Sequence, residues 1–282
     1  LANGFAYVEL ARQAGLHVDA FAPRLSFFFN AHIDFFEEIA KYRAARRIWA
    51  RWMRDRYGAT DERSMQMRFH AQTAGVSLTA QQPEVNIVRT AVEALAAVLG
   101  GTQSLHTNSM DEALALPTEK AARIALRTQQ VIAHETNVAH VADPFGGSWF
   151  MEELTDEMER RASEIFDAID AMGGGSMLEG CIKGIEENWF QGRIADSAYE
   201  LERAFNAGER VVVGANRFLE GNEEGFGDIL RITQEQEERQ RTRLDSVRRD
   251  RNDEKVAAAR DRIAFEAANP ETNLMPALID AS

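Results

Sequence analysis

Three short segments with the character of β-strands recur along the first half of this 282-residue chain, and a helical pattern follows each of them. Residues 25–30 (LSFFFN) are apolar and aromatic, residues 65–72 (MQMRFHAQ) are less apolar, and residues 102–107 (TQSLHT) are mostly polar. The helical pattern of residues 85–99 is apolar almost throughout. Alternating strands and helices at this spacing predict a parallel sheet, either a (β/α) barrel or a doubly wound sheet.

The strand–helix pattern accounts for only about the first 133 residues, whereas a closed eight-stranded barrel needs roughly 200 or more. If the fold is a barrel, we therefore expect its first half to lie outside this chain. The chain begins without methionine, and it ends within a new apolar helical pattern at residues 273–279. Both features lead us to expect a piece of a longer protein.

The second half of the chain has a different character. Turn-forming residues at 143–148 precede helical patterns at 152–172 and 177–207. Residues 235–267 are rich in Arg, Glu, Asp and Gln, which favours a solvated helix or pair of helices over an arm that wraps a partner. We predict a partial barrel domain over 1–140, a helical extension over 141–234 and a charged helical linker or arm over 235–282.

The charge and composition of the chain exclude several classes of partner and site. The formal charge of −13 disfavours nucleic acid, and the longest apolar runs are too short to cross a bilayer. The single cysteine, Cys181, excludes an intrachain disulfide and fits a reducing compartment, so we predict a cytoplasmic protein without a membrane partner. The six histidines have no metal-ligand spacing, and we predict no metal site. P-loop, dinucleotide-binding and nucleophile-elbow motifs are absent.

Polar side chains gather where chemistry is found in parallel α/β folds, at the carboxyl ends of the strands. The period of two places Arg24, Ser26 and Phe28 on one face of the first strand, and His70 and Gln72 on one face of the second. Dry, unpaired polar groups inside a barrel would cost several kcal/mol. These faces therefore either pair with each other as structural residues or line a polar ligand site.

The strand segments resemble the large chain of methylmalonyl-CoA mutases. The resemblance is most specific over residues 100–109 (GGTQSLHTNS). It extends to residues 24–29 (RLSFFF), 68–75 (RFHAQTAG), 111–117 (DEALALP), 143–148 (DPFGGS) and 211–218 (VVVGANRF). It therefore covers most of the chain.

The resemblance implies an α/β fold, the C-terminal half of a (β/α)₈ TIM barrel (about strands six to eight) followed by a mainly helical region. In the family the coenzyme A chain threads the barrel, and adenosylcobalamin lies over the carboxyl ends of the strands. The implied reaction is a radical carbon-skeleton rearrangement, in which the cofactor supplies the radical. The family's cobalt-ligand motif is not in this chain, so we expect a cobalamin-binding domain or subunit as a partner.

The resemblance also implies roles for residues. His70 and Gln72 are expected at the catalytic pocket and the corrin face. The implied contacts with coenzyme A, the acyl group and the pocket wall are Arg24, Ser26, Phe28, Gln103 and Ser104. The implied contacts with the cofactor are Asn108, Glu112 and Ala113, of which Asn108 and Glu112 would hold the adenosyl ribose.

Conversion of (R)-methylmalonyl-CoA to succinyl-CoA is the first reaction that the resemblance implies. The family's acyl-reading residues lie before this chain begins, so isobutyryl-, 2-hydroxyisobutyryl- and ethylmalonyl-CoA mutases stay as alternatives. A non-catalytic homologous scaffold subunit is a further alternative. We expect a homodimer, heterodimer or heterotetramer, and an inactive protein if this chain is isolated.

Overall fold

The computed structural model describes residues 1–219 and 229–282 of the chain. These residues fall into two units, Leu1–Leu230 and Arg231–Ser282. The predicted extension over 141–234 therefore includes nine residues, 220–228, that lie outside the described part. The first unit is α/β and mostly helical.

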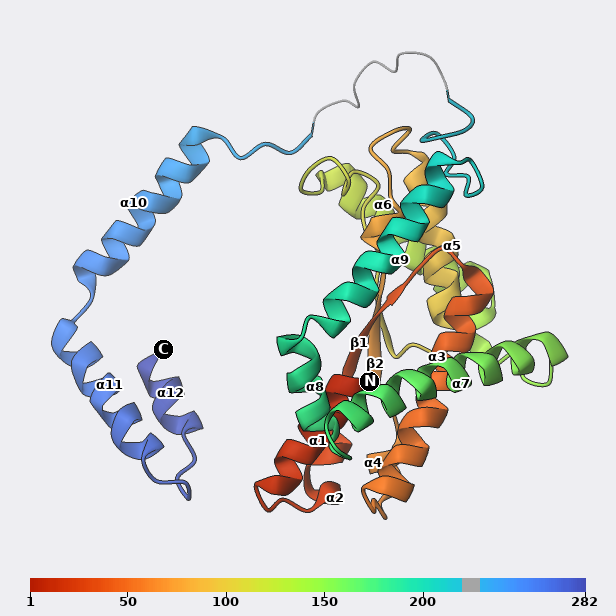
Figure 1. Cartoon of the computed structure of the whole chain (residues 1–282). Coiled ribbons are helices and arrows are strands. Elements are labelled where there is room, and N and C mark those ends of the chain that lie inside the picture. Colours follow the sequence, from red (N-terminus) through yellow and green to blue (C-terminus); the bar gives the residue numbers. More distant parts are fainter. Residues whose placement is uncertain (220–228) are drawn as a thin grey trace. The chain divides into compact units, whose positions relative to one another are not determined.

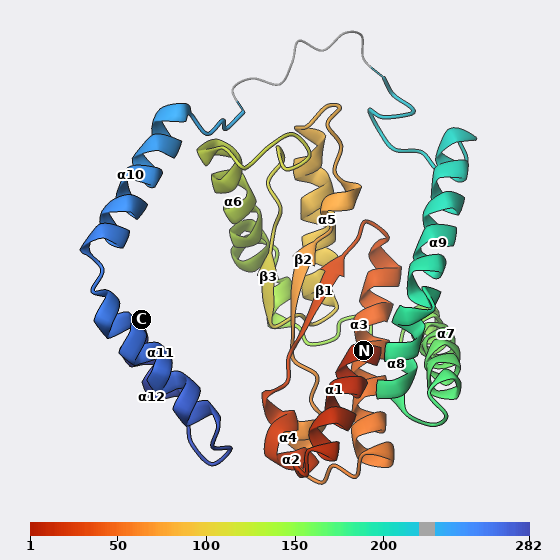
Figure 2. The ribbon, with the colours of Figure 1, turned by 60° about the vertical axis from the view of Figure 1, so that its left-hand side comes forward.

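A three-stranded parallel sheet lies at the centre of the first unit (Figure 2). Its strands are β1 (Phe27–Ala31), β2 (Phe69–Thr73) and β3 (Ser104–His106), in that order across the sheet. All three lie within or overlap the segments predicted as strands, and they are parallel as predicted.

Helices cover one face of this sheet. The helices that follow the strands are α3 (Phe35–Arg51), α5 (Val85–Leu99) and α6 (Glu119–Glu135). Helix α5 contacts all three strands, and α6 packs on α5. Gly100 and Gly101 end α5, and the Thr118 hydroxyl caps α6 by accepting a hydrogen bond from the Ala121 amide.

One aromatic core joins the sheet to the N-terminal helix α1 (Ala2–Gln13). Phe5 of α1 stacks on Trp52 with ring centroids 4.2 Å apart, and Tyr42 of α3 stacks on Phe69 of β2 at 4.9 Å. Such rings bury large apolar areas, so they fix α3 against the sheet. The alternate side chains of the strands, which are not part of this core, therefore lie on the opposite face of the sheet.

Three further helices extend this unit (Figure 1): α7 (Trp149–Met172), α8 (Met177–Glu186) and α9 (Trp189–Asn206). Helix α7 packs on α3, and α8 packs on α1 and α7. The pattern at 177–207 predicts one helical stretch, but Asn188 with a φ of 57° divides it into two helices. Short helical segments, α2 (Val18–Phe21) and α4 (Glu62–Met65), complete this part.

The second unit consists of α10 (Gln234–Asp250), α11 (Asp253–Ala267) and α12 (Met275–Ala281). No residue of α10 or α11 is buried, and α11 packs on α12. The charged run therefore forms two successive helices, and both alternatives for its role, a solvated pair or an arm, stay predictions. Within the described residues, none of the helices combines the length and apolarity that crossing a membrane requires.

Arg43 is expected to be a main link between α3 and α7. Its guanidinium is only 10% exposed, donates to Thr155 Oγ1 (2.9 Å) and pairs with Glu152 (2.6 Å). Arg43→Ala is expected to lower the free energy of unfolding by about 2 kcal/mol, because it leaves these acceptors without their buried donor. Urea unfolding measures this loss. The control is Arg54→Ala, whose exposed pair with Asp55 should contribute almost nothing, and equal losses would contradict the prediction.

Candidate functional site

The open face of the sheet presents two rows of side chains at its carboxyl end. The strand register places Phe28 beside His70 and His70 beside Ser104, and one step further it aligns Asn30, Gln72 and His106. Of these six side chains, Phe28, Asn30, Ser104 and His106 are exposed, and His70 and Gln72 are half-buried. The predicted sharing of a face by His70 and Gln72 is therefore found in the structure.

The first row is linked by direct contacts. The ring centroids of Phe28 and His70 are 5.2 Å apart, and His70 Nδ1 lies 2.8 Å from Ser104 Oγ. Phe28 is 60% exposed although it is aromatic. An exposed ring beside a hydrogen-bonded imidazole is suited to hold a ligand that has both apolar and polar parts.

In the second row, formed by Asn30, Gln72 and His106, Gln72 contacts the buried side-chain amide of Asn108. Gln72 Nε2 donates to Asn108 Oδ1 at 2.9 Å, and the Asn108 backbone amide donates to Thr73 Oγ1 at 2.9 Å. Asn108 is 2% exposed, yet its Nδ2 has no hydrogen-bond partner within the described residues. A buried donor without a partner costs free energy, so this group is poised to donate to a ligand.

Gly75 lets a second polar group approach the Asn108 amide. A Cβ atom on Gly75 would lie 2.8 Å from Glu112 Oε1 and 3.1 Å from Asn108 Nδ2. The carboxylate and the amide therefore converge over a backbone position that has room only for glycine. The arrangement offers an acceptor and a donor side by side.

Glu112 borders a cavity of about 650 Å³ at the carboxyl end of the sheet, together with Gln72 and His106. Desolvation raises the pKa of the Glu112 carboxyl, and the negative charge of Asp111 adds to this, while His106 opposes it. Among the described residues, no three His, Cys, Asp or Glu side chains are grouped as a metal site requires. The donors and acceptors of Gln72, Asn108 and Glu112 suit hydrogen bonding to a polar ligand.

The remaining predicted site residues lie elsewhere. Arg24 and Ser26 are exposed at the amino end of β1, the opposite end from Asn108. Gln103 Oε1 accepts from the Phe69 backbone amide (2.6 Å) and its Nε2 donates to the Gly101 carbonyl (3.1 Å), so its amide is engaged with backbone. Ala113 is exposed in the turn after β3.

The structure thus brings together Phe28, His70, Gln72, Ser104, Asn108 and Glu112, and it does not bring Gln103 or Arg24 to them. It also places Asn30 and His106, polar residues at the strand ends, beside this group, and it adds Gly75, to which the sequence analysis gave no role. Gly75 could not be identified from the sequence, because its role depends on a contact with Glu112, which is 37 positions away in the sequence.

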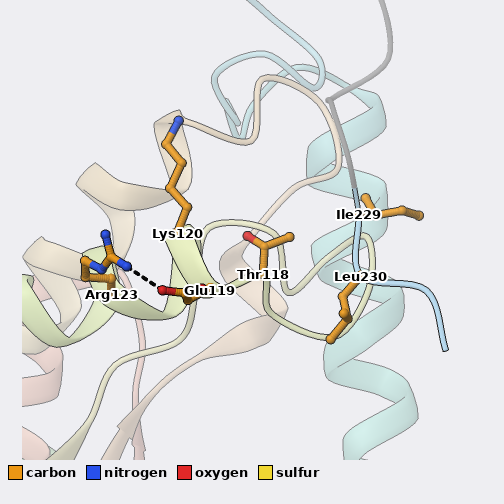
Figure 3. Close-up of a pocket in the computed structure, with 6 residues that line it drawn as sticks. All are labelled: Thr118, Glu119, Lys120, Arg123, Ile229 and Leu230. Atoms are coloured by element: carbon orange, nitrogen blue, oxygen red, sulfur yellow. Dashed lines mark hydrogen bonds and ion pairs between the residues drawn. The ribbon is translucent and has the colours of Figure 1, made fainter. Parts of the chain in front are cut away.

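A second pocket, of about 470 Å³, lies at the start of α6 and is lined by Thr118, Glu119, Lys120, Arg123, Ile229 and Leu230 (Figure 3). Its hydroxyl and carboxylate already have partners: Thr118 caps the helix, and Glu119 pairs with Arg123 at 2.5 Å. We therefore place the candidate site at the sheet.

Known proteins are similar to this chain over its whole length. A family model for methylmalonyl-CoA mutase matches residues 1–282. The 2-hydroxyisobutanoyl-CoA mutase large subunit of Aquincola tertiaricarbonis is 48% identical over 99% of this chain, and the match covers 49% of that protein. The methylmalonyl-CoA mutases of Rhizobium meliloti and Escherichia coli are 43% and 41% identical over all of this chain, which covers 39% and 38% of those proteins.

The chain spans about half, or less, of the length of these curated relatives. The relatives are mutases, a class of isomerase, and the family match has no gap at either end of the chain. The chain therefore belongs to the methylmalonyl-CoA mutase family.

Proposed function

We propose that this chain is part of an adenosylcobalamin-dependent acyl-CoA mutase and forms about strands six to eight of its (β/α)₈ barrel. The observation that carries the proposal is the convergence of Asn108 and Glu112 over Gly75 in a chain of this family. Residues 1–140 would be the partial barrel, 141–234 a helical extension and 235–282 a charged linker.

The polar groups over Gly75 fit the ribose of an adenosyl group. A ribose carries two neighbouring hydroxyls, and each can donate or accept a hydrogen bond. Asn108 Nδ2 is a buried donor without a partner, and Glu112 Oε1 is an acceptor beside it. This donor–acceptor pair therefore matches a vicinal diol, and the absence of a side chain at Gly75 lets both groups approach the same point.

The open face of the sheet supports a second part of the proposal, that an acyl-CoA lies along it. In an ordinary barrel such inward positions are filled by branched aliphatic side chains. Here these positions carry Phe28, His70 and Ser104, and the exposed Arg24 side chain at the amino end of β1 is suited to meet a phosphate. We propose His70 and Gln72 as the catalytic-pocket residues, and Ala113 as a further contact with the cofactor.

The chemistry that adenosylcobalamin supplies when bound is homolysis of its cobalt–carbon bond, which provides the radical that starts the rearrangement. The residues of this chain bind the cofactor, orient the substrate and shield the reacting groups from water. Asn108 and Glu112 hold the ribose, and His70 orients the substrate through a hydrogen bond. The surrounding barrel excludes water, which prevents side reactions of a radical.

Two acyl-CoA thioesters are candidate substrates. Methylmalonyl-CoA, rearranged to succinyl-CoA, is the first proposal, since two of the compared relatives carry that name. The 2-hydroxyisobutyryl thioester is the second, because the large subunit named for that reaction is 48% identical while the other two are 43% and 41% identical. A cobalamin-binding domain or subunit would complete either enzyme, and a cytoplasmic location fits the single buried Cys181.

The assembled enzyme tests the proposal directly. Each of the two acyl-CoA thioesters is incubated with enzyme and adenosylcobalamin, and the rearranged isomer is separated by chromatography. The proposal predicts conversion of one thioester that depends on added adenosylcobalamin. Binding of neither adenosylcobalamin nor acyl-CoA would favour a non-catalytic scaffold subunit instead.

Phe28 provides a test of the acyl-CoA surface. Phe28→Ala is expected to raise KM for the acyl-CoA about tenfold, because a ring that a ligand covers contributes about 1.5 kcal/mol or more. Folding stability should change little, since the ring is 60% exposed in the chain alone. Steady-state kinetics measures KM. Phe36→Ala, on α3 and 43% exposed, is the matched control and should leave KM unchanged.

A further inference from the structure

A buried carboxylate on α5 contacts the loop that carries Gly75. Glu93 is fully buried, and its Oε1 forms a hydrogen bond with the Ser77 hydroxyl. Ser77 belongs to the turn that follows β2, and its Oγ also lies 2.8 Å from the Ala74 carbonyl oxygen. Glu93 therefore contacts, from behind the sheet, the short turn that contains Gly75.

The two contacts of the Ser77 hydroxyl indicate the protonation state of the Glu93 carboxyl. A hydroxyl has one hydrogen, but Ser77 Oγ lies against two oxygen acceptors, the Ala74 carbonyl and the Glu93 carboxyl. Both contacts are hydrogen bonds only if the Glu93 carboxyl is protonated and donates to Ser77. The charged groups that face Glu93 are Glu38 of α3 and Arg89 of α5, and the Tyr42 phenol also lies near it.

The turn links this carboxyl to the ligand site. Ala74 donates its amide to the Ala31 carbonyl at 2.8 Å, so the turn is tied to β1 on one side. Ser77 ties it to α5 on the other. Gly75 lies between these anchors, with its Cα facing Glu112 Oε1 and Asn108 Nδ2. A shift of the turn would change the space in front of both polar groups.

We propose that Glu93 is a positioning residue, which acts through Ser77 to hold Gly75 at the distance from Asn108 and Glu112 that the cofactor ribose requires. This inference rests on the proposed function. It assigns Glu93 no contact with substrate or cofactor. Groups that orient the ligands of bound metals commonly change metal affinity by about tenfold or more when they are removed, and we expect a similar factor here.

The test uses the assembled enzyme and measures the dissociation constant of adenosylcobalamin from the change in its absorbance. The variants are Glu93→Ala, Ser77→Ala, the double variant and Glu93→Gln, whose amide can still donate to Ser77. Leu99→Ala, at the far end of α5, is the control for a general loss of stability. Hydrogen exchange of the amides of residues 74–78, without cofactor, reports on the turn itself.

Each alanine variant is expected to raise the dissociation constant about tenfold, as the loss of one buried hydrogen bond implies, and to speed exchange of the turn. The double variant should be no weaker than the single ones, because both remove the same link. Glu93→Gln should bind within about twofold of the wild type. Leu99→Ala should lower the melting temperature without changing the dissociation constant.

Wild-type affinity in the alanine variants would overturn the inference, and so would additive losses or a Glu93→Gln variant as weak as Glu93→Ala. These outcomes leave the proposed function intact, because they require a wild type that binds adenosylcobalamin. A wild-type enzyme that does not bind it would overturn the proposed function, and the inference with it.

Discussion

Replacing Asn108 with alanine is expected to lower kcat of the assembled enzyme by about a hundredfold, because the substitution removes the only unpaired buried amide donor that the described site aims at the ribose. A displacement of about 1 Å in a reacting group can cost that factor. The fold should persist, since the lost contact within the chain is a single hydrogen bond from Gln72. Steady-state kinetics with saturating adenosylcobalamin measures kcat, and circular dichroism checks the fold.

The control for this prediction is Asn206→Ala, an exposed amide at the end of α9 that should leave kcat unchanged. Glu112→Gln keeps the shape of the second ribose-holding side chain and one acceptor oxygen, so it should lose less than Asn108→Ala. Unchanged kinetics in Asn108→Ala would remove Asn108 from the proposed cofactor contacts. A variant that no longer folds would instead assign Asn108 a structural role.

The strands and the open face of the sheet could be predicted because both depend on local pattern. The period of two in β2 places His70 and Gln72 on one face whatever the rest of the chain does. The long helix after β2 was likewise predicted over 85–99, and α5 has those bounds. The parallel direction of the strands followed from the helix between each pair, since parallel neighbours need a crossover connection.

What could not be predicted depends on contacts between residues distant in the sequence. The apolar pattern of α5 gave no reason to single out Glu93, because its burial depends on the turn that contains Ser77. Gln103 has the polar character of a pocket residue, but it accepts a hydrogen bond from the Phe69 amide one strand away. The break at Asn188 is a left-handed backbone conformation in a helical pattern, and such residues are not marked by hydrophobic periodicity.

The burial of Glu93 also predicts how the free energy of unfolding changes with pH. Burial raises the pKa of its carboxyl from 4.5 to about 7, and the charge of Glu38 adds to this, while the hydrogen bond from Ser77 and the charge of Arg89 oppose it. Because the folded pKa exceeds the unfolded one, the stability that the protonated carboxyl contributes is complete below about pH 4.5. It is lost as pH rises to about 7, and the loss approaches about 3 kcal/mol.

Glu93→Gln should remove this pH dependence, because the amide does not ionise and can replace the protonated carboxyl at Ser77. The variant and the wild type are expected to unfold with similar free energies at pH 5, and the variant should be more stable by up to about 3 kcal/mol at pH 8. Urea unfolding at several pH values measures the difference, in which other titrating groups cancel. Glu84→Gln, exposed at the start of α5, should show no difference at either pH. A difference between Glu93→Gln and wild type that stays constant from pH 5 to pH 8 would mean that Glu93 is ionised throughout, and that Ser77 donates to it rather than to Ala74.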